Sequence, residues 1–178
     1  MRDEVILVDT NDHEIGVMEK MEAHEKALLH RAFSVFLFNR KGDMLLQQRA
    51  FSKYHSGGQW TNTCCSHPRP GESTIDAANR RLHEEMGIHT QLNKVFDFTY
   101  QAPFDNGLVE HEYDHVFVGE YEGSIEPNPD EVADFKFESI VNIEEQIHIA
   151  PQEFTPWFKI AFPKVQEWWH KNYTTHES

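Results

Sequence analysis

The sequence predicts an α/β fold in which a mixed sheet is sandwiched between helices. Segments with strand-like alternation are interspersed along the chain with three or four segments whose apolar residues recur at helical spacing. The composition, with 39% hydrophobic and 26% charged residues, is ordinary for a soluble globular protein. With 178 residues the chain is long enough for one well-formed core. We therefore expect a single domain over residues 1–178, with a frayed tail at 174–178.

The first half of the chain predicts two hairpins separated by a short helix. Glu4–Asp9 alternates and is rich in β-branched residues, and Ile15–Met18 follows a polar turn as its partner. Lys20–Leu29 is compatible with a helix. Ala32–Asn39 is strongly apolar, and Met44–Arg49 returns after a turn that contains a glycine.

A loop over Phe51–Gln59 leads to a predicted short strand, Trp60–Cys65. The next helix opens at Gly71-Glu72-Ser73 and stops at Gly87, which is the usual residue just past a helix end. Its apolar stripe should consist of Ile75, Ala78, Leu82 and Met86.

The second half predicts strands at Val95–Gln101, Leu108–Tyr121 and Phe135–Glu138, followed by a short helix at Ile140–His148. Thr155 and Pro156 suit the cap and first turn of a closing helix, Trp157–Asn172, which Pro163 should interrupt and kink.

The net charge and the cysteine content limit the partners and the cellular compartment that we expect for this chain. A formal net charge of −14 argues against a nucleic-acid partner, although a few local cations can still hold a small phosphorylated ligand. The two cysteines are adjacent and so cannot form an ordinary disulfide, which favours a reducing, cytoplasmic setting. Residues 1–9 do not resemble a secretory signal, and no apolar run is long enough to span a bilayer.

Two carboxylates on one strand provide the first candidate site. Side chains two apart on a strand share a face, so Glu110 and Glu112 project together and His111 projects the other way. The apolar residues that follow indicate a central strand. There the pair favours a metal site over a solvated face, because two buried carboxylates repel unless a cation or proton lies between them. Imidazole and carboxylate ligands suit Mg²⁺, Mn²⁺ or Zn²⁺.

The twelve histidines are too many for any one to stand out. A surface or hydrogen-bonded role is the simpler expectation for His13, His55, His83, His89, His148, His170 and His176.

The helix before Gly87 carries arginines and glutamates four residues apart, Arg80 with Glu84 and Arg81 with Glu85. Taken alone they read as surface salt bridges. The segment also resembles the Nudix box, G-x5-E-x7-R-E-U-x-E-E-x-G-U, where U is bulky and apolar. Ser66 stands at its first glycine and Arg81 stands where a glutamate is required. The other positions match at Glu72, Arg80, Leu82, Glu84, Glu85, Gly87 and Ile88. The resemblance implies a Nudix-type α/β/α sandwich with an altered hydrolase box.

Further motifs resemble the type 1 isopentenyl-diphosphate isomerases. WTNTCCSHP followed by GES is similar to the cysteine motif of that family, YQAPFDNGLVEHE to its glutamate motif and EFTPW to its tryptophan motif. LLHRAFS and QQRAFSKY match its early segments. The resemblance runs in order from about Glu19 to Trp157.

This resemblance implies a set of site residues. Catalytic roles fall on Cys65, Glu112, Tyr100 and Trp157. Binding of the substrate diphosphate falls on Lys20, Arg49, Lys53 and Arg81. Metal ligands fall on His24, His30, His67, Glu110 and Glu112, which would hold Mn²⁺, Mg²⁺ or Zn²⁺, while Glu85 would share a Mg²⁺ with the diphosphate.

The reaction implied is the interconversion of isopentenyl and dimethylallyl diphosphate through a tertiary carbocation, by a monomer or weak homodimer. Two alternatives are a Nudix hydrolase acting on a nucleoside or other diphosphate, and a non-catalytic metal- or ligand-binding module. Arg81, Cys65 and His67 disfavour hydrolysis, which needs neither a thiol nor an arginine at those positions.

Overall fold

The computed structural model describes residues 3–53, 55–104 and 106–172; the predicted frayed tail at 174–178 lies outside them. Within this part of the chain, nine strands form one mixed sheet. The strands are β1 (Glu4–Val8), β2 (Glu14–Glu19), β3 (His30–Phe38), β4 (Met44–Arg49), β5 (Trp60–Thr61), β6 (Cys64–Ser66), β7 (Asn93–Pro103), β8 (Val109–Glu120) and β9 (Val132–Glu138). The helices are α1 (Lys20–Glu25), α2 (Thr74–Met86), α3 (Ile140–Ile149), the 3-10 turn η1 (Pro151–Glu153) and α4 (Pro156–Asn172).

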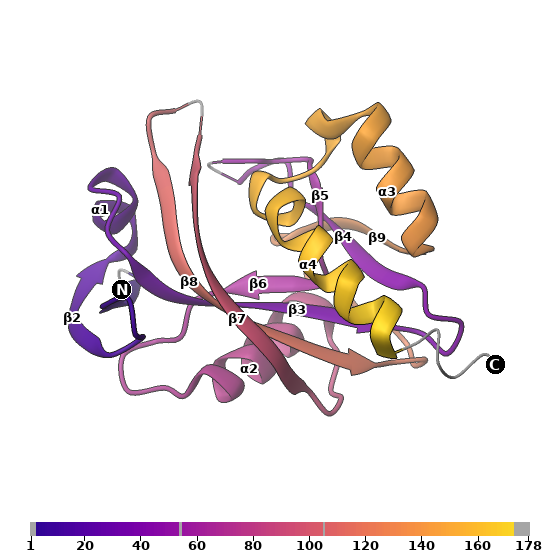
Figure 1. The fold of residues 1–178 in the computed structure, drawn as a ribbon, viewed down its shortest axis with the longest axis horizontal. Coiled ribbons are helices and arrows are strands. Elements are labelled where there is room, and N and C mark those ends of the chain that lie inside the picture. Colours follow the sequence, from indigo (N-terminus) through magenta and orange to yellow (C-terminus); the bar gives the residue numbers. More distant parts are fainter. Residues whose placement is uncertain (1–2, 54, 105, 173–178) are drawn as a thin grey trace.

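Strand β3 lies at the centre of the sheet (Figure 1). It runs parallel to β8, with His30 opposite Glu112 and Phe38 opposite Glu120, and antiparallel to β6. Strand β8 also pairs with β7 in a long antiparallel hairpin, and β4 pairs with β5 and β9. The amino-terminal ends of the parallel pair therefore meet, and the predicted ligands His30 and Glu112 are register partners there.

The predicted hairpin of β3 and β4 closes only at its turn, where Phe38 pairs with Met44. Beyond that point the strands separate around Thr63, whose hydroxyl accepts from Leu37 N at 2.9 Å and donates to Leu45 O at 2.6 Å. The side chain of Asn62 likewise donates to two backbone carbonyls. The prediction of one strand over Trp60–Cys65 was therefore wrong: side chains replace the ladder at 62–63 and divide it into β5 and β6.

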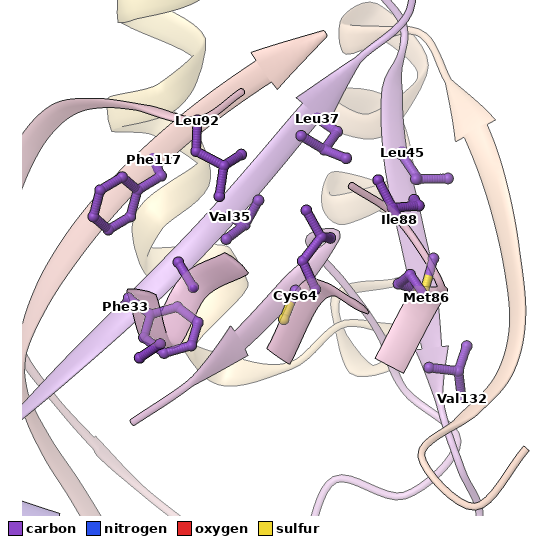
Figure 2. Close-up of a cluster of buried hydrophobic side chains, with 13 residues drawn as sticks. Phe33, Val35, Leu37, Leu45, Cys64, Met86, Ile88, Leu92, Phe117 and Val132 are labelled. Atoms are coloured by element: carbon purple, nitrogen blue, oxygen red, sulfur yellow. The ribbon is translucent and has the colours of Figure 1, made fainter. Parts of the chain in front are cut away.

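The sheet separates two apolar cores, which confirms the predicted α/β/α sandwich. Alternate residues of β3 face opposite sides because the side-chain period of a strand is two. Phe33, Val35 and Leu37 join the core beneath α2, which Figure 2 shows together with Cys64. Phe36 and Phe38 join the core beneath α3 and α4. None of the described helices is both long and apolar enough to cross a membrane.

Helix α2 begins and ends as its sequence predicts. The Ser73 side chain accepts from Asp76 N, and Gly87 ends the helix in the left-handed region at φ 66°. The prediction for Ile75 was wrong: it is 36% exposed, and Ala77 takes its place on the buried stripe. That stripe also contains a charged residue, Glu85, which is 5% exposed.

Helix α4 starts at Pro156 after the Thr155 cap, whose hydroxyl accepts from Phe158 N at 3.3 Å. The predicted interruption at Pro163 was wrong, since the helix runs through it to Asn172. Proline removes one backbone hydrogen bond, but Phe158 and Phe162 before it and Val165 after it are all buried against the sheet. Their packing keeps both halves of the helix on the sheet.

Candidate active site

Glu110 and Glu112 project from one face of β8 and are both buried, as their spacing predicts. The Tyr100 hydroxyl of β7 contacts both carboxylates, at 2.7 Å from Glu112 Oε2 and at a shorter distance from Glu110 Oε1. A phenol carries one proton, so it cannot donate to both at once. Burial and the neighbouring Glu112 raise the pKa of Glu110 to about 7. Below that pH the protonated carboxyl of Glu110 therefore supplies the proton for its contact with Tyr100, and the Tyr100 hydroxyl donates to Glu112.

The pKa of Glu112 is shifted in the opposite direction. Burial alone would raise its pKa, but His67 and His30 hold it well below the usual value. His67 Nε2 lies 2.8 Å from Glu112 Oε1, and His30 Nε2 lies 3.4 Å from the same oxygen. Glu112 is therefore the ionised member of the carboxylate pair.

Three histidines surround these carboxylates. His24 comes from α1, His30 begins β3, and His67 follows β6; their ring centroids lie 4.9 to 6.0 Å apart. The Nδ1 atoms of His24 and His30 lie 2.7 and 2.9 Å from backbone carbonyls. A carbonyl can only accept, so each Nδ1 carries a proton and the Nε2 atom of each ring faces the site. Burial lowers the pKa of His30, but its contact with Glu112 outweighs burial and leaves that pKa raised.

Among the described residues, the Nε2 atoms of these rings are not all paired with a hydrogen-bond donor. His24 Nε2 is buried without a hydrogen-bond partner among the described residues, and His30 Nε2 lies 3.2 Å from His67 Nε2. One ligand atom from each of His24, His30, His67 and Glu112 lies within 4.8 Å of all the others. Glu110 Oε2 lies 3.8 Å from His24 Nε2 and adds a fifth donor. Converging imidazole and carboxylate ligand atoms fit a divalent metal ion.

The two cysteines of β6 face opposite sides of the sheet. Cys64 is fully buried in the core under α2 (Figure 2). Cys65 lines the cavity beside the carboxylates. Burial raises the pKa of Cys65 well above its usual value; Arg49 opposes that shift, and nearby glutamates add to it. The Cys65 thiol therefore keeps its proton at neutral pH.

Arg81 and Glu85 on α2 form the predicted salt bridge, with Nη2 and Oε2 2.9 Å apart. The other Glu85 oxygen accepts from Gln47 Nε2 at 3.0 Å. Arg81 also lies 3.4 Å from Glu131, which pairs with Lys53. Arg81 and Lys53, two of the four cations predicted to bind the diphosphate, thus line the cavity and are each paired with a carboxylate.

A cavity of about 90 Å³ brings these groups together. Of the thirteen predicted site residues, only His30 does not line it, being buried behind the other ligands. Those that line it are Lys20, His24, Arg49, Lys53, Cys65, His67, Arg81, Glu85, Tyr100, Glu110, Glu112 and Trp157. A wider hollow of about 600 Å³ adjoins it and shares Lys20, Lys53 and Arg81. The cations therefore lie between the buried carboxylates and solvent.

Sequence reasoning missed four lining residues: Gln47, His55, Ser66 and Glu131. His55 was expected to have a surface or hydrogen-bonded role, but it lines the cavity and is only partly exposed, and its ring stacks on Phe104 and meets the edge of Trp157. Nothing local distinguishes it in the sequence. Gln47 does not stand out either, because two further polar residues, Gln48 and Arg49, follow it in β4.

Comparison with known proteins agrees with this site. Residues 28–158 match the model of the NUDIX domain. Solved structures give the same fold: a protein from Deinococcus radiodurans has a TM-score of 0.70 at 15% identity, covering 83% of this chain and 90% of its own. A MutT protein from Methanosarcina mazei has a TM-score of 0.64 at 17% identity, covering 78% of this chain and 94% of its own.

Curated relatives define the family within that fold. The chain is 51% identical to the isopentenyl-diphosphate Delta-isomerase of Pectobacterium atrosepticum, over 93% of each chain. It is 47% identical to that of Burkholderia multivorans, over 96% of this chain and all of the relative. The fold is that of a NUDIX protein, and Arg81 stands where the Nudix box requires a glutamate. Within that class, the chain belongs to the isopentenyl-diphosphate Delta-isomerase family, which confirms the family predicted from its motifs.

Proposed function

We propose that this chain interconverts isopentenyl diphosphate and dimethylallyl diphosphate by adding one proton and removing another through a tertiary carbocation. The observation that supports this most directly is the pairing of Cys65 and Glu112 in one cavity. Environment drives their pKa values apart, so that a protonated thiol faces the same space as an ionised carboxylate. Such separation marks an acid and a base with distinct roles.

Cys65 and Glu112 are the two proton carriers. An unactivated alkene is a poor base, so its protonation needs a positioned acid and a site that excludes bulk water. The group that donates in one direction of this reversible reaction accepts in the other. Tyr100 assists Glu112 through its 2.7 Å hydrogen bond, and burial together with Glu110 raises its pKa, so the phenol stays a donor.

Trp157 stabilises the carbocation with its π face. The residue is 4% exposed, and its ring already has the Arg49 guanidinium 5.0 Å from its centroid. A desolvated cation–π contact is worth about 2 kcal/mol or more.

The diphosphate binds at Lys20, Lys53 and Arg81, which line both the cavity and the wider hollow, and at Arg49, which lines the cavity beside Trp157. Phosphate oxygens would replace Glu131 as the partner of Arg81 and Lys53. Glu85 would share a Mg²⁺ with the diphosphate once it is released from Arg81 and Gln47.

His24, His30, His67, Glu110 and Glu112 would hold one divalent ion, Mn²⁺, Mg²⁺ or Zn²⁺. The unpartnered His24 Nε2 and the 3.2 Å approach of two imidazole nitrogens support this assignment. A bound cation supplies positive charge that orients Glu112 and lowers its pKa.

The enzyme should work as a monomer or weak homodimer in the cytoplasm, without a membrane or nucleic-acid partner. Two free cysteines, one of them facing the cavity, suit a reducing compartment.

A simple assay tests the proposal. The protein is incubated with isopentenyl diphosphate, Mg²⁺ and Mn²⁺, and both organic products and released phosphate are measured. The proposal predicts dimethylallyl diphosphate without phosphate release. Release of phosphate or pyrophosphate would indicate a hydrolase, and binding without turnover would indicate a binding module; either result contradicts the proposal.

A further inference from the structure

Three aromatic rings from three separate segments meet at one end of the cavity. His55, in the segment between β4 and β5, stacks on Phe104, just after β7, with ring centroids 4.4 Å apart and planes 10° apart. Both rings stand edge-on to Trp157, at 5.7 Å and 85° for His55 and at 6.2 Å and 87° for Phe104. The three rings form a corner in which two parallel rings abut the indole proposed to stabilise the cation.

The corner closes the apolar end of the site. His55 and Trp157 line the cavity, while Phe104 packs behind them on the cluster of Tyr100, Ala102 and Trp157. Arg49 ties the corner together, because its guanidinium lies over the Trp157 ring and its Nη2 donates to His55 O at 3.3 Å. The His55–Phe104 contact thus joins the β4–β5 segment to the end of the β7–β8 hairpin beside Trp157.

The packing of His55 supports an apolar role. Its ring stacks on Phe104 with the two planes only 10° apart, and the residue is only partly exposed. The faces of a ring stacked in this way provide apolar cover of the kind that Phe104 provides.

We propose that the stacked pair His55–Phe104 is the wall that keeps water from the carbocation beside Trp157, and so directs the cation to the alkene product. This inference rests on the proposed isomerase activity. A water molecule that reached the tertiary carbon would form a C–O bond with an oxygen lone pair and lose one proton. The product would be the hydrated five-carbon diphosphate, a tertiary alcohol, formed without any oxidation or reduction.

The test measures product partition in H₂¹⁸O by mass spectrometry. Removing either ring, in His55→Ala or Phe104→Ala, should raise the ratio of ¹⁸O-labelled alcohol to dimethylallyl diphosphate by about tenfold over the unmodified enzyme, the effect of a barrier change near 1.4 kcal/mol. His83→Ala is the matched control. It breaks a similarly close ring stack, 4.3 Å from His89, on the exposed surface of the molecule, and it should leave the ratio unchanged.

Two conservative variants distinguish exclusion of water by the two rings from a general requirement that this segment be folded. His55→Phe retains a flat ring and Phe104→Leu retains apolar volume, so both should keep the ratio near that of the unmodified enzyme. Alcohol formation by His55→Phe at the level of His55→Ala would overturn the inference, as would alanine variants that lose rate with no alcohol. Failure of the unmodified enzyme to isomerise would instead overturn the proposed function itself.

Discussion

His67 Nε2 lies 2.8 Å from Glu112 Oε1. This contact links the segment after β6 to strand β8, which are 45 residues apart in sequence. It exists because β3 pairs with β6 on one edge and with β8 on the other. Together with His30 at the start of β3, the two residues form the centre of the proposed metal site.

Loss of His67 should therefore weaken metal binding. His67→Ala removes one of four donors that lie within 4.8 Å of one another, and we expect Mn²⁺ affinity to fall by at least about tenfold to a hundredfold. Isothermal titration calorimetry with Mn²⁺ measures this. His89→Ala, at an exposed position, is the control and should bind Mn²⁺ normally. Equal affinity in His67→Ala would remove His67 from the ligand set.

Metal affinity should depend on pH through Glu110. Its pKa is raised to about 7, so the metal-free site holds a proton below that pH, and binding must displace it. Affinity should accordingly rise with pH, and Mn²⁺ should bind about tenfold more weakly at pH 6 than at pH 8. Glu110→Gln should bind less tightly and with a shallower dependence on pH, because His30, whose pKa is also raised, still has a proton to lose. An affinity that is flat from pH 6 to pH 8 in the unmodified protein would contradict the assigned proton.

The neighbouring arginines of α2 should behave differently. Both arginines line the wider hollow, but only Arg81 also lines the cavity, and Arg80 is held by Glu72 at 2.8 Å and by Glu84 at 2.8 Å. Arg81→Ala should raise KM for isopentenyl diphosphate by about tenfold or more, the size of a lost charge-assisted contact. Arg80→Ala should change KM by less than about twofold. Steady-state kinetics compare the two, and equal effects would contradict a specific phosphate contact for Arg81.

Trp157 should tolerate another aromatic ring but not its removal. Trp157→Phe retains a π face and should keep much of the activity, while Trp157→Ala should lose about thirtyfold or more in kcat, the equivalent of roughly 2 kcal/mol. Thermal unfolding of both variants controls for lost packing. Normal turnover by a folded Trp157→Ala protein would show that Trp157 only packs beneath its helix.

Much of the site could be predicted from the sequence because its residues lie in regular helices and strands. The period of two in β8 identified Glu110 and Glu112 as neighbours, and the motifs supplied the histidines and cations. The position of His55 in the site could not be predicted from the sequence, since its burial depends on Phe104 from the end of a distant strand. The split at Asn62-Thr63 was also hidden, because side-chain hydrogen bonds that replace a backbone ladder leave no periodic signal.

The most direct test of the account follows deuterium from D₂O into the product of isopentenyl diphosphate turnover, by mass spectrometry and NMR. The unmodified enzyme and Cys64→Ala should both give deuterated dimethylallyl diphosphate, because Cys64 faces the core. Cys65→Ala should give none, because one of the two proton carriers is missing. Deuterated product from Cys65→Ala, with none from a folded Cys64→Ala protein, would contradict the assignment of Cys65 as a proton carrier.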